Sequence, residues 1–211
     1  MKHQSSPGRT LVHLRVQTRE LHQGAESLLD LPTLRTLERY RSLLSILLGF
    51  HRPLEQRLAR LDLGAVGVNL HERLKTPLLE RDLRCFSVDL ASVPVCGDLP
   101  VLLALPEALG CLYVLEGATL GGQIISRHLR ETMNVVPDGG GAFFASDGRD
   151  VGPMWRAFRD ALEAGCPGED EAIRAGDAAV CTFASFNRRL ADGPVRSRSD
   201  PRAPENEVRA S

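Results

Sequence analysis

Three glycines lie inside one helical pattern, and they constrain the fold more than any other feature of the chain. In LPEALGCLYVLEGATLGGQIISRHLRETM, residues 105–133, apolar residues recur at helical spacing on both sides of EGATLGG. Each glycine costs about 1 kcal/mol relative to alanine inside a helix. Gly117 and Gly121 are four residues apart and share a face, and Gly122 follows directly. The segment predicts a helix with a bare strip that a flat ligand, or another helix, can approach closely.

The remaining segments also show helical spacing, and none shows sustained alternation of apolar and polar residues. Residues 87–100 are rich in turn formers and read as a loop or a short helix, while the glycine run in 137–150 predicts a mobile loop. The sum is an all-α bundle of six or seven helices. The expected helices cover 10–29, 32–62, 71–84, 106–133, 152–165 and 169–190. The helix over 71–84 is interrupted, or begins again, near Pro77.

Length and composition indicate one globular domain. The 211 residues are 43 % apolar, enough for a sizeable core. We expect the helical domain to cover 10–190, with a flexible N-terminus over 1–9 and a disordered, proline-containing tail over 191–211.

Charge and cysteine content exclude several classes of protein. The formal net charge of −1 gives no reason to expect nucleic-acid binding. The longest uninterrupted apolar run is too short to span a membrane, and the N-terminus lacks the apolar region of a secretory signal. Five scattered cysteines without a CxxC pair fit a reducing cytoplasm better than a disulfide framework.

A second candidate site lies near the N-terminus, in LRVQTRELHQGAES. His22 shares a helical face with Arg15, with Thr18 or Arg19, and with Glu26. Glu26, four residues on, can accept a hydrogen bond from one imidazole nitrogen and leave the other free to bind a metal. Taken alone, the pair is also compatible with a solvent-exposed His–Glu interaction on an amphipathic helix.

The other histidines carry less information. We expect them to lie on the surface, although Glu55 follows His51 at the same spacing that joins Glu26 to His22. No ExxH, HExxH or paired CxxC pattern occurs, which argues against di-iron and zinc sites. The histidines in this group are His13, His51, His71 and His128.

Taken together, TRELHQGAES and LYVLEGATLGGQ resemble heme oxygenases of the bacterial branch, and the EGxxLGG form resembles the bacteriophytochrome-associated type. The resemblance implies a single all-α domain that holds heme between a proximal and a distal helix. It implies that His22 is the proximal iron ligand with Glu26 beside it. It also implies that Gly117, Gly121 and Gly122 form the flexible distal face.

The same resemblance implies further heme contacts. Arg15, Tyr113 and Arg156 match positions that meet heme propionates, and Thr18 lies on the proximal face. Phe183 lies in the region that walls the distal pocket.

One position departs from the family pattern. Many members have an aspartate directly after the first distal glycine, where it organises water, and this chain has Ala118. Thr119 or Glu116 can supply a polar group nearby, so we include Thr119 with Gly117 and Gly121 as catalytic candidates. The departure bears on proton delivery more than on heme binding.

The implied reaction is the oxidative opening of heme to biliverdin, carbon monoxide and ferrous iron, with heme as both cofactor and substrate. Oxygen is the co-substrate. Because the chain carries no flavin or iron–sulfur signature, electrons must come from outside. The resemblance implies an external ferredoxin or flavoprotein reductase as their source. The product serves a bacteriophytochrome as chromophore, or the reaction releases iron from scavenged heme.

Two other readings remain open at this point. A heme carrier or sensor of the same fold needs no turnover, and Ala118 motivates it. A plain helical interaction domain uses the glycines only for packing against another helix.

Overall fold

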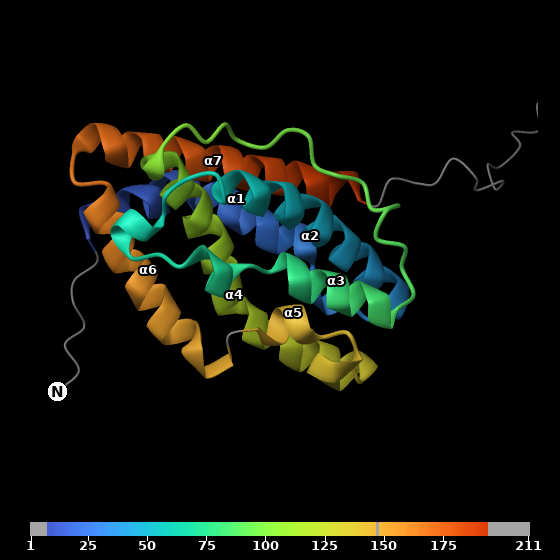
Figure 1. Cartoon of the computed structure of the whole chain (residues 1–211). Helices are drawn as coiled ribbons and strands as arrows, with labels where there is room; N and C mark the ends of the chain where they lie inside the picture. The colour runs from blue at the N-terminus through green and yellow to red at the C-terminus, as the bar shows by residue number, and fades with distance from the viewer. Residues whose placement is uncertain (1–7, 147, 194–211) are drawn as a thin grey trace, which may run out of the picture.

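The computed structural model describes residues 8–146 and 148–193. These residues form a bundle of α-helices joined by short 3₁₀ turns and by one long loop (Figure 1). The fold class therefore agrees with the expected all-α domain. The α-helices are α1 (Arg9–Leu29), α2 (Leu37–Leu58), α3 (Thr76–Cys85), α4 (Leu105–Met133), α5 (Ala142–Ala145), α6 (Val151–Gly165) and α7 (Glu169–Asp192).

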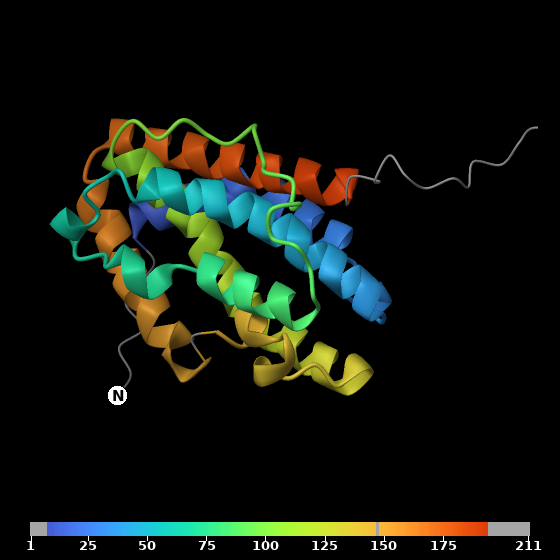
Figure 2. The same cartoon turned by 45° about the vertical axis from the view of Figure 1, so that its right-hand side comes forward.

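Helix α7 packs along α1 and α4, and α2 runs beside it in both views of the bundle (Figures 1 and 2). The buried face of α7 is made of small residues, so neighbouring backbones approach closely. At Gly110 the backbones of α4 and α7 are so close that a side chain on Gly110 would collide with the carbonyl oxygen of Ala175. Close helix packing, the alternative use of glycine, thus occurs at Gly110 of α4.

Two apolar clusters hold the bundle together. The first joins α1, the second half of α2, α6, α7 and the first half of α4, with Leu11, Leu109 and Phe158 fully buried. The second joins the first half of α2, α3, α5 and the end of α4, and includes the fully buried Tyr40 and Leu83. Because each buried Leu or Phe side chain contributes about 1.5–3 kcal/mol, these clusters supply most of the stability. The space between them is where the cavity described below lies.

Three predicted elements were wrong in part. The helix predicted over 71–84 begins only at Thr76, with Pro77 in its first turn, and Leu70–Arg73 form a separate 3₁₀ turn. The second helix begins at Leu37 rather than residue 32, because the Thr36 side chain caps it by accepting a hydrogen bond from the amide of Arg39 at 3.3 Å. The segment 137–150, predicted as a loop, contains α5, a single helical turn. Asp82, 60 residues earlier in the chain, caps the start of α5. The sequence around 142–145 therefore contains no capping residue that would predict this turn.

Helix α4 is long and apolar enough to cross a membrane by length and composition, with a mean hydropathy of 1.3 over its best window. Half of that window is buried inside the bundle, as in the core helix of a globular domain. The predicted flexible ends, 1–9 and 191–211, lie almost entirely outside the described residues. Where the two overlap, α1 begins at Arg9 and α7 continues to Asp192, so the helical domain is slightly longer at both ends than predicted.

Candidate functional site

A largely apolar cavity of about 410 Å³ opens between α1 and α4. This volume is in the range of small-molecule sites. Side chains from α1, α2, α4, α5 and α7 line it, so the site requires the assembled bundle. It brings together His22, Glu26, Phe183 and the EGATLGG segment, which are far apart in sequence. The lining residues used below are His22, Glu26, Phe50, His51, Gly117, Ala118, Thr119, Gly121, Gly122, Phe143, Ser146 and Phe183.

His22 lies on the α1 side of this cavity with an accessible ring. Its side chain is 54 % exposed, and its Nδ1 atom is 3.6 Å from Oε1 of Glu26. That distance is an ion-pair distance, longer than a hydrogen bond. Because Glu26 approaches Nδ1, the Nε2 atom stays available for a metal. Phe183 of α7 packs edge-on against the ring, with centroids 5.8 Å apart, and limits its rotation.

The three glycines of α4 have two different surroundings. A Cβ atom added to Gly117 or Gly121 would meet nothing within 4 Å. These two positions therefore leave open space on the cavity side of the helix. A Cβ atom on Gly122 would lie 2.9 Å from the carbonyl oxygen of Phe144, so that glycine is required for α5 to sit on α4. The predicted bare strip is thus formed by Gly117 and Gly121, while Gly122 also serves packing.

Thr119 and Glu116, the two polar residues close to Ala118, differ in their position relative to the cavity. Thr119 lines the cavity, and its hydroxyl donates a hydrogen bond to the backbone oxygen of Glu116 at 2.7 Å. The Glu116 side chain is buried and forms an ion pair with Arg73 at 2.6 Å. Glu116 does not line the cavity. Of the two candidates to replace the missing acid, only Thr119 is placed at the cavity.

His51 was predicted to lie on the surface, and this is wrong. Its side chain is 4 % exposed and lines the cavity, edge-on against the ring of Phe143 at 5.4 Å. The helical pattern placed it among charged neighbours, but Arg52 and Glu55 are themselves covered by α3 and the turn before it. Only the His51–Glu55 spacing, the same as that of His22 and Glu26, gave a signal in the sequence.

Glu55 is the neighbour of His51 inside the protein. Its Oε1 atom is 3.5 Å from Nδ1 of His51 and accepts a hydrogen bond from the amide of Lys75 at 2.8 Å, and the amide of Thr76 donates to the same carboxylate. Burial opposes ionisation of Glu55, but His51 and these amides outweigh burial and hold the pKa of Glu55 below its ordinary value. Nδ1 of His51 makes no hydrogen bond within the described part of the chain.

Four predicted heme contacts do not line the cavity. Arg15 on α1 and Arg156 on α6 are exposed. Thr18 and Tyr113 are buried, with their hydroxyl oxygens 3.5 Å apart, and Thr18 also donates to the backbone oxygen of Leu14 at 2.8 Å. Their roles stay predictions, because polar side chains outside the cavity can reach only the edge of a ligand.

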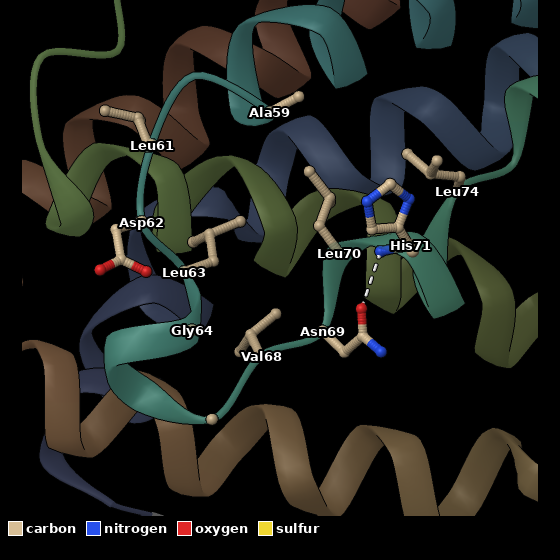
Figure 3. Close-up of a pocket in the computed structure, with 11 residues that line it drawn as sticks. Ala59, Leu61, Asp62, Leu63, Gly64, Val68, Asn69, Leu70, His71 and Leu74 are labelled. Atoms are coloured by element: carbon tan, nitrogen blue, oxygen red, sulfur yellow. Dashed lines mark hydrogen bonds between the residues drawn. The ribbon is translucent and has the colours of Figure 1, made fainter.

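A second hollow of about 560 Å³ lies away from these residues (Figure 3). One stretch of chain, residues 59–74, lines it, and the exposed His71 contributes an imidazole to this lining. His71 lies beside Leu70 and Leu74, and its backbone amide donates to the Asn69 side chain at 3.2 Å. Because its lining residues all come from this one segment, the hollow lacks the two-sided geometry of the first cavity.

The residues of the first cavity fit a flat, apolar, iron-containing ligand. His22 offers an accessible nitrogen on one side, and the missing side chains at Gly117 and Gly121 leave room on the other. Within the described residues no group of three or more His, Cys, Asp or Glu side chains can hold a metal ion. Metal binding by the described residues would therefore use fewer than three of these side chains, which is compatible with a metal that brings its own macrocycle.

Comparison with known proteins agrees with this geometry. The family model described as "Heme oxygenase" matches residues 9–192. A protein named "Heme oxygenase" from Xanthomonas campestris is 32 % identical over 159 residues, which cover 74 % of this chain and 87 % of that protein. The chain belongs to the heme oxygenase family. It is accordingly a heme-degrading enzyme. Because this relative is bacterial, the predicted resemblance to bacterial heme oxygenases is confirmed.

Two solved structures share the fold. One is the heme oxygenase of Neisseria meningitidis with NO or CO bound, with a TM-score of 0.73, 21 % identity and coverage of 86 % of this chain and 89 % of that one. The other is heme oxygenase-1 of the cyanobacterium Synechocystis in complex with heme, with a TM-score of 0.71, 20 % identity and coverage of 88 % and 92 %. The single-domain helical fold is thereby confirmed.

Proposed function

We propose that this chain binds heme in the cavity between α1 and α4 and opens it to biliverdin, carbon monoxide and ferrous iron. The single observation that carries this proposal is the pairing of an accessible His22 with the open strip at Gly117 and Gly121 across one cavity. Heme bound there supplies the iron at which oxygen is reduced and the ring that is oxidised. The heme complex of the cyanobacterial relative supports the choice of ligand.

The roles of the α1 residues follow from their positions. His22 would hold the iron through Nε2, and Glu26, 3.6 Å from Nδ1, would orient the imidazole and favour the tautomer that leaves Nε2 free. A neutral imidazole is a weaker electron donor than a thiolate. Arg15, Tyr113 and Arg156 are proposed to meet the propionates, with Thr18 positioning Tyr113 through the contact between their hydroxyls.

On the opposite wall, the backbone of Gly117 and Gly121 provides steric guidance, because no side chain separates it from the cavity. Thr119 and His51 are the polar groups that can organise water where Ala118 leaves no acid. His51 is the stronger candidate, because Glu55, 3.5 Å from its Nδ1 atom, orients the imidazole and the ring lines the cavity. Thr119 contributes a hydroxyl oxygen that can still accept a hydrogen bond while its proton is engaged.

Electrons are proposed to come from an external ferredoxin or flavoprotein reductase. The odd number of scattered cysteines supports a cytoplasmic location. The EGxxLGG form of the distal segment supports delivery of biliverdin to a bacteriophytochrome, with iron release from heme as the alternative use of the same reaction.

The test of the catalytic proposal uses purified protein, hemin, a reductant and oxygen. We expect a shifted Soret band at stoichiometric hemin, followed by its loss and the appearance of biliverdin absorbance. A Soret band that persists without biliverdin would instead indicate a heme carrier or sensor, the reading that Ala118 favours. No Soret shift at all would contradict heme binding.

The role of His51 at the cavity has its own test. His51→Phe keeps an aromatic ring against Phe143 but removes both nitrogens, so turnover should fall while hemin affinity stays close to wild type. His71→Phe, at an exposed histidine outside the cavity, is the matched control. Wild-type turnover in His51→Phe would remove His51 from the mechanism.

A further inference from the structure

The α5 turn forms part of the cavity wall opposite α1. The Phe143 ring lines the cavity and packs against the rings of His51 and Phe144, with centroids 5.4 Å and 4.8 Å apart. The backbone oxygen of Phe144 faces Gly122 of α4 without an intervening side chain. Phe143 is therefore an aromatic wall beside the open strip of the distal helix. The position of its ring depends on how α5 is held.

A helical turn of four residues has too few internal hydrogen bonds to be stable alone. The start of α5 is held by Asp82 of α3. Its Oδ1 atom accepts from the amide of Ala142 at 2.9 Å, and its Oδ2 atom accepts from the amide of Phe143 at 2.8 Å. The Asp82 side chain is completely buried. Both oxygens of a buried carboxylate are thus committed to the two amides that fix the Phe143 backbone.

Burying a carboxylate is costly unless hydrogen bonds compensate. Here burial raises the pKa of Asp82, although the two amides of α5 act in the opposite direction. An apolar residue at this position would spare the chain that cost but would leave both amides without acceptors. Burying the Asp82 carboxylate therefore costs more free energy than packing an apolar side chain at the same position. What it provides is a fixed backbone at the residue whose ring enters the cavity.

We propose that Asp82 is a positioning residue for product selectivity: through α5 it fixes the Phe143 ring and so limits how heme is rotated within the cavity. This inference rests on the proposed function. The four meso bridges of heme differ only in the substituents around them, so the bridge that faces the open strip depends on the in-plane rotation of the ring. An aromatic wall held at one position excludes some rotations by contact.

A nearby anchor of the same loop provides a control. The Tyr40 hydroxyl donates a hydrogen bond to the backbone oxygen of Gly140 at 2.8 Å, two residues before α5. Tyr40→Phe removes this bond but leaves the Asp82 contacts with Ala142 and Phe143 intact. It should lower stability without changing the position of the Phe143 ring. Comparing Tyr40→Phe with Asp82→Ala therefore distinguishes a loss of stability from a change in the position of the Phe143 ring.

The experiment begins with the ligand-free protein. Amide hydrogen exchange is measured over residues 137–146 in wild type, Asp82→Ala and Tyr40→Phe. We expect Asp82→Ala to speed exchange within α5 at least about tenfold, because the turn loses both acceptors at its start. Unchanged exchange in this variant would overturn the proposal. Should Asp82→Ala fail to fold, Phe143→Ala, which removes a half-buried ring, takes its place in the next step.

The same proteins are then loaded with hemin and turned over, and the biliverdin isomers are separated. We expect Asp82→Ala and Phe143→Ala to change the isomer ratio at least about threefold, equivalent to about 0.7 kcal/mol between competing barriers. Tyr40→Phe should give the wild-type ratio. A wild-type ratio in Phe143→Ala or in folded Asp82→Ala would overturn the proposal, and so would the same shift in Tyr40→Phe.

Failure of the proposed function is recognised separately. If wild type binds hemin but forms no biliverdin, circular dichroism of the Soret band reports how the hemin sits. A change of that signal in Asp82→Ala and Phe143→Ala, with none in Tyr40→Phe, still supports the positioning role, and an unchanged signal overturns it. If wild type shows no Soret shift, the proposed function and the positioning role are both refuted.

Discussion

The wall formed by α1 and the wall formed by α4 and α5 hold their functional groups in different ways. On α1, His22 and Glu26 are 54 % and 69 % exposed and contact mainly each other and Phe183. On the other side, α5 is fixed by the buried Asp82 and by direct backbone contact at Gly122, and Tyr40 anchors the loop before it at Gly140. A wall that forms a bond to its ligand must leave the bonding atom accessible. A wall that guides by shape must be rigid.

This contrast predicts that substitutions on α1 change ligation, while substitutions on α4 and α5 change stability and selectivity. The largest effect is expected for His22→Ala, which removes the proposed iron ligand. Biliverdin formation should be abolished, and added imidazole should restore part of it by occupying the vacated space. Activity is followed by biliverdin absorbance.

His13→Ala is the matched control for that substitution, because His13 lies on the same helix and outside the cavity. It should leave biliverdin formation unchanged. Full activity in His22→Ala would show that another residue ligates the iron, and the contrast between the walls would then be misassigned.

Replacing Glu26 tests the second group of the α1 wall. Glu26→Gln keeps the shape but removes the charge beside Nδ1 of His22, so the imidazole becomes a weaker donor. Loss of such a partner typically costs about 10- to 100-fold in metal affinity or activity. Hemin dissociation and turnover are both measured. Unchanged values would reduce Glu26 to a solvent-exposed neighbour.

The adjacent glycines of α4 give a paired prediction with opposite signs. Gly121→Ala should raise the free energy of unfolding by up to about 1 kcal/mol, because alanine favours the helix and its Cβ meets nothing. The same methyl group narrows the cavity, so turnover should fall. Gly122→Ala should lower the free energy of unfolding by about 1–3 kcal/mol, since its Cβ presses on the Phe144 carbonyl.

Urea unfolding measures both stabilities, and hemin turnover measures the cost to function. If both alanines destabilised the protein equally, the open strip at Gly121 would not exist.

The smallest effect concerns Glu55, behind His51. Its folded pKa is lowered, so its contribution to stability is fully present above the ordinary value of 4.5 and is lost as pH falls through the folded pKa. The advantage of wild type over Glu55→Gln in free energy of unfolding should therefore shrink below about pH 4.5. Urea titrations at several pH values measure it. A difference that is independent of pH would contradict the assigned charge state.

Much of the fold could be predicted because helices are local. Six of the seven α-helices in the described residues follow from apolar spacing, and α1 and α4 were placed within one residue. Helix α5 could not be predicted, because the acceptor that caps it is in α3. The burial of His51 was missed for the same reason, since the cover over Glu55 comes from the turn before α3. Spacing identifies a helix, but tertiary contacts decide which side of it is covered.

The site shows the same division. His22, Glu26, Gly117 and Gly121 were identified from spacing within a helix and from the family resemblance, and the structure places all four at one cavity. The role of Gly122 in packing was not predictable, because its partner is the backbone of Phe144. Thr18 and Tyr113 contact each other and do not line the cavity, which spacing within a single helix could not indicate.

The central claim is that α1 and α4 hold heme between His22 and the open strip for ring opening. The most direct measurement is the absorbance spectrum of the hemin-loaded protein during incubation with a reductant and oxygen, compared with His22→Ala. The account predicts that the Soret band of wild type decays as biliverdin absorbance rises, and that His22→Ala forms no biliverdin. A stable Soret band in wild type, or equal biliverdin formation by both proteins, would contradict it.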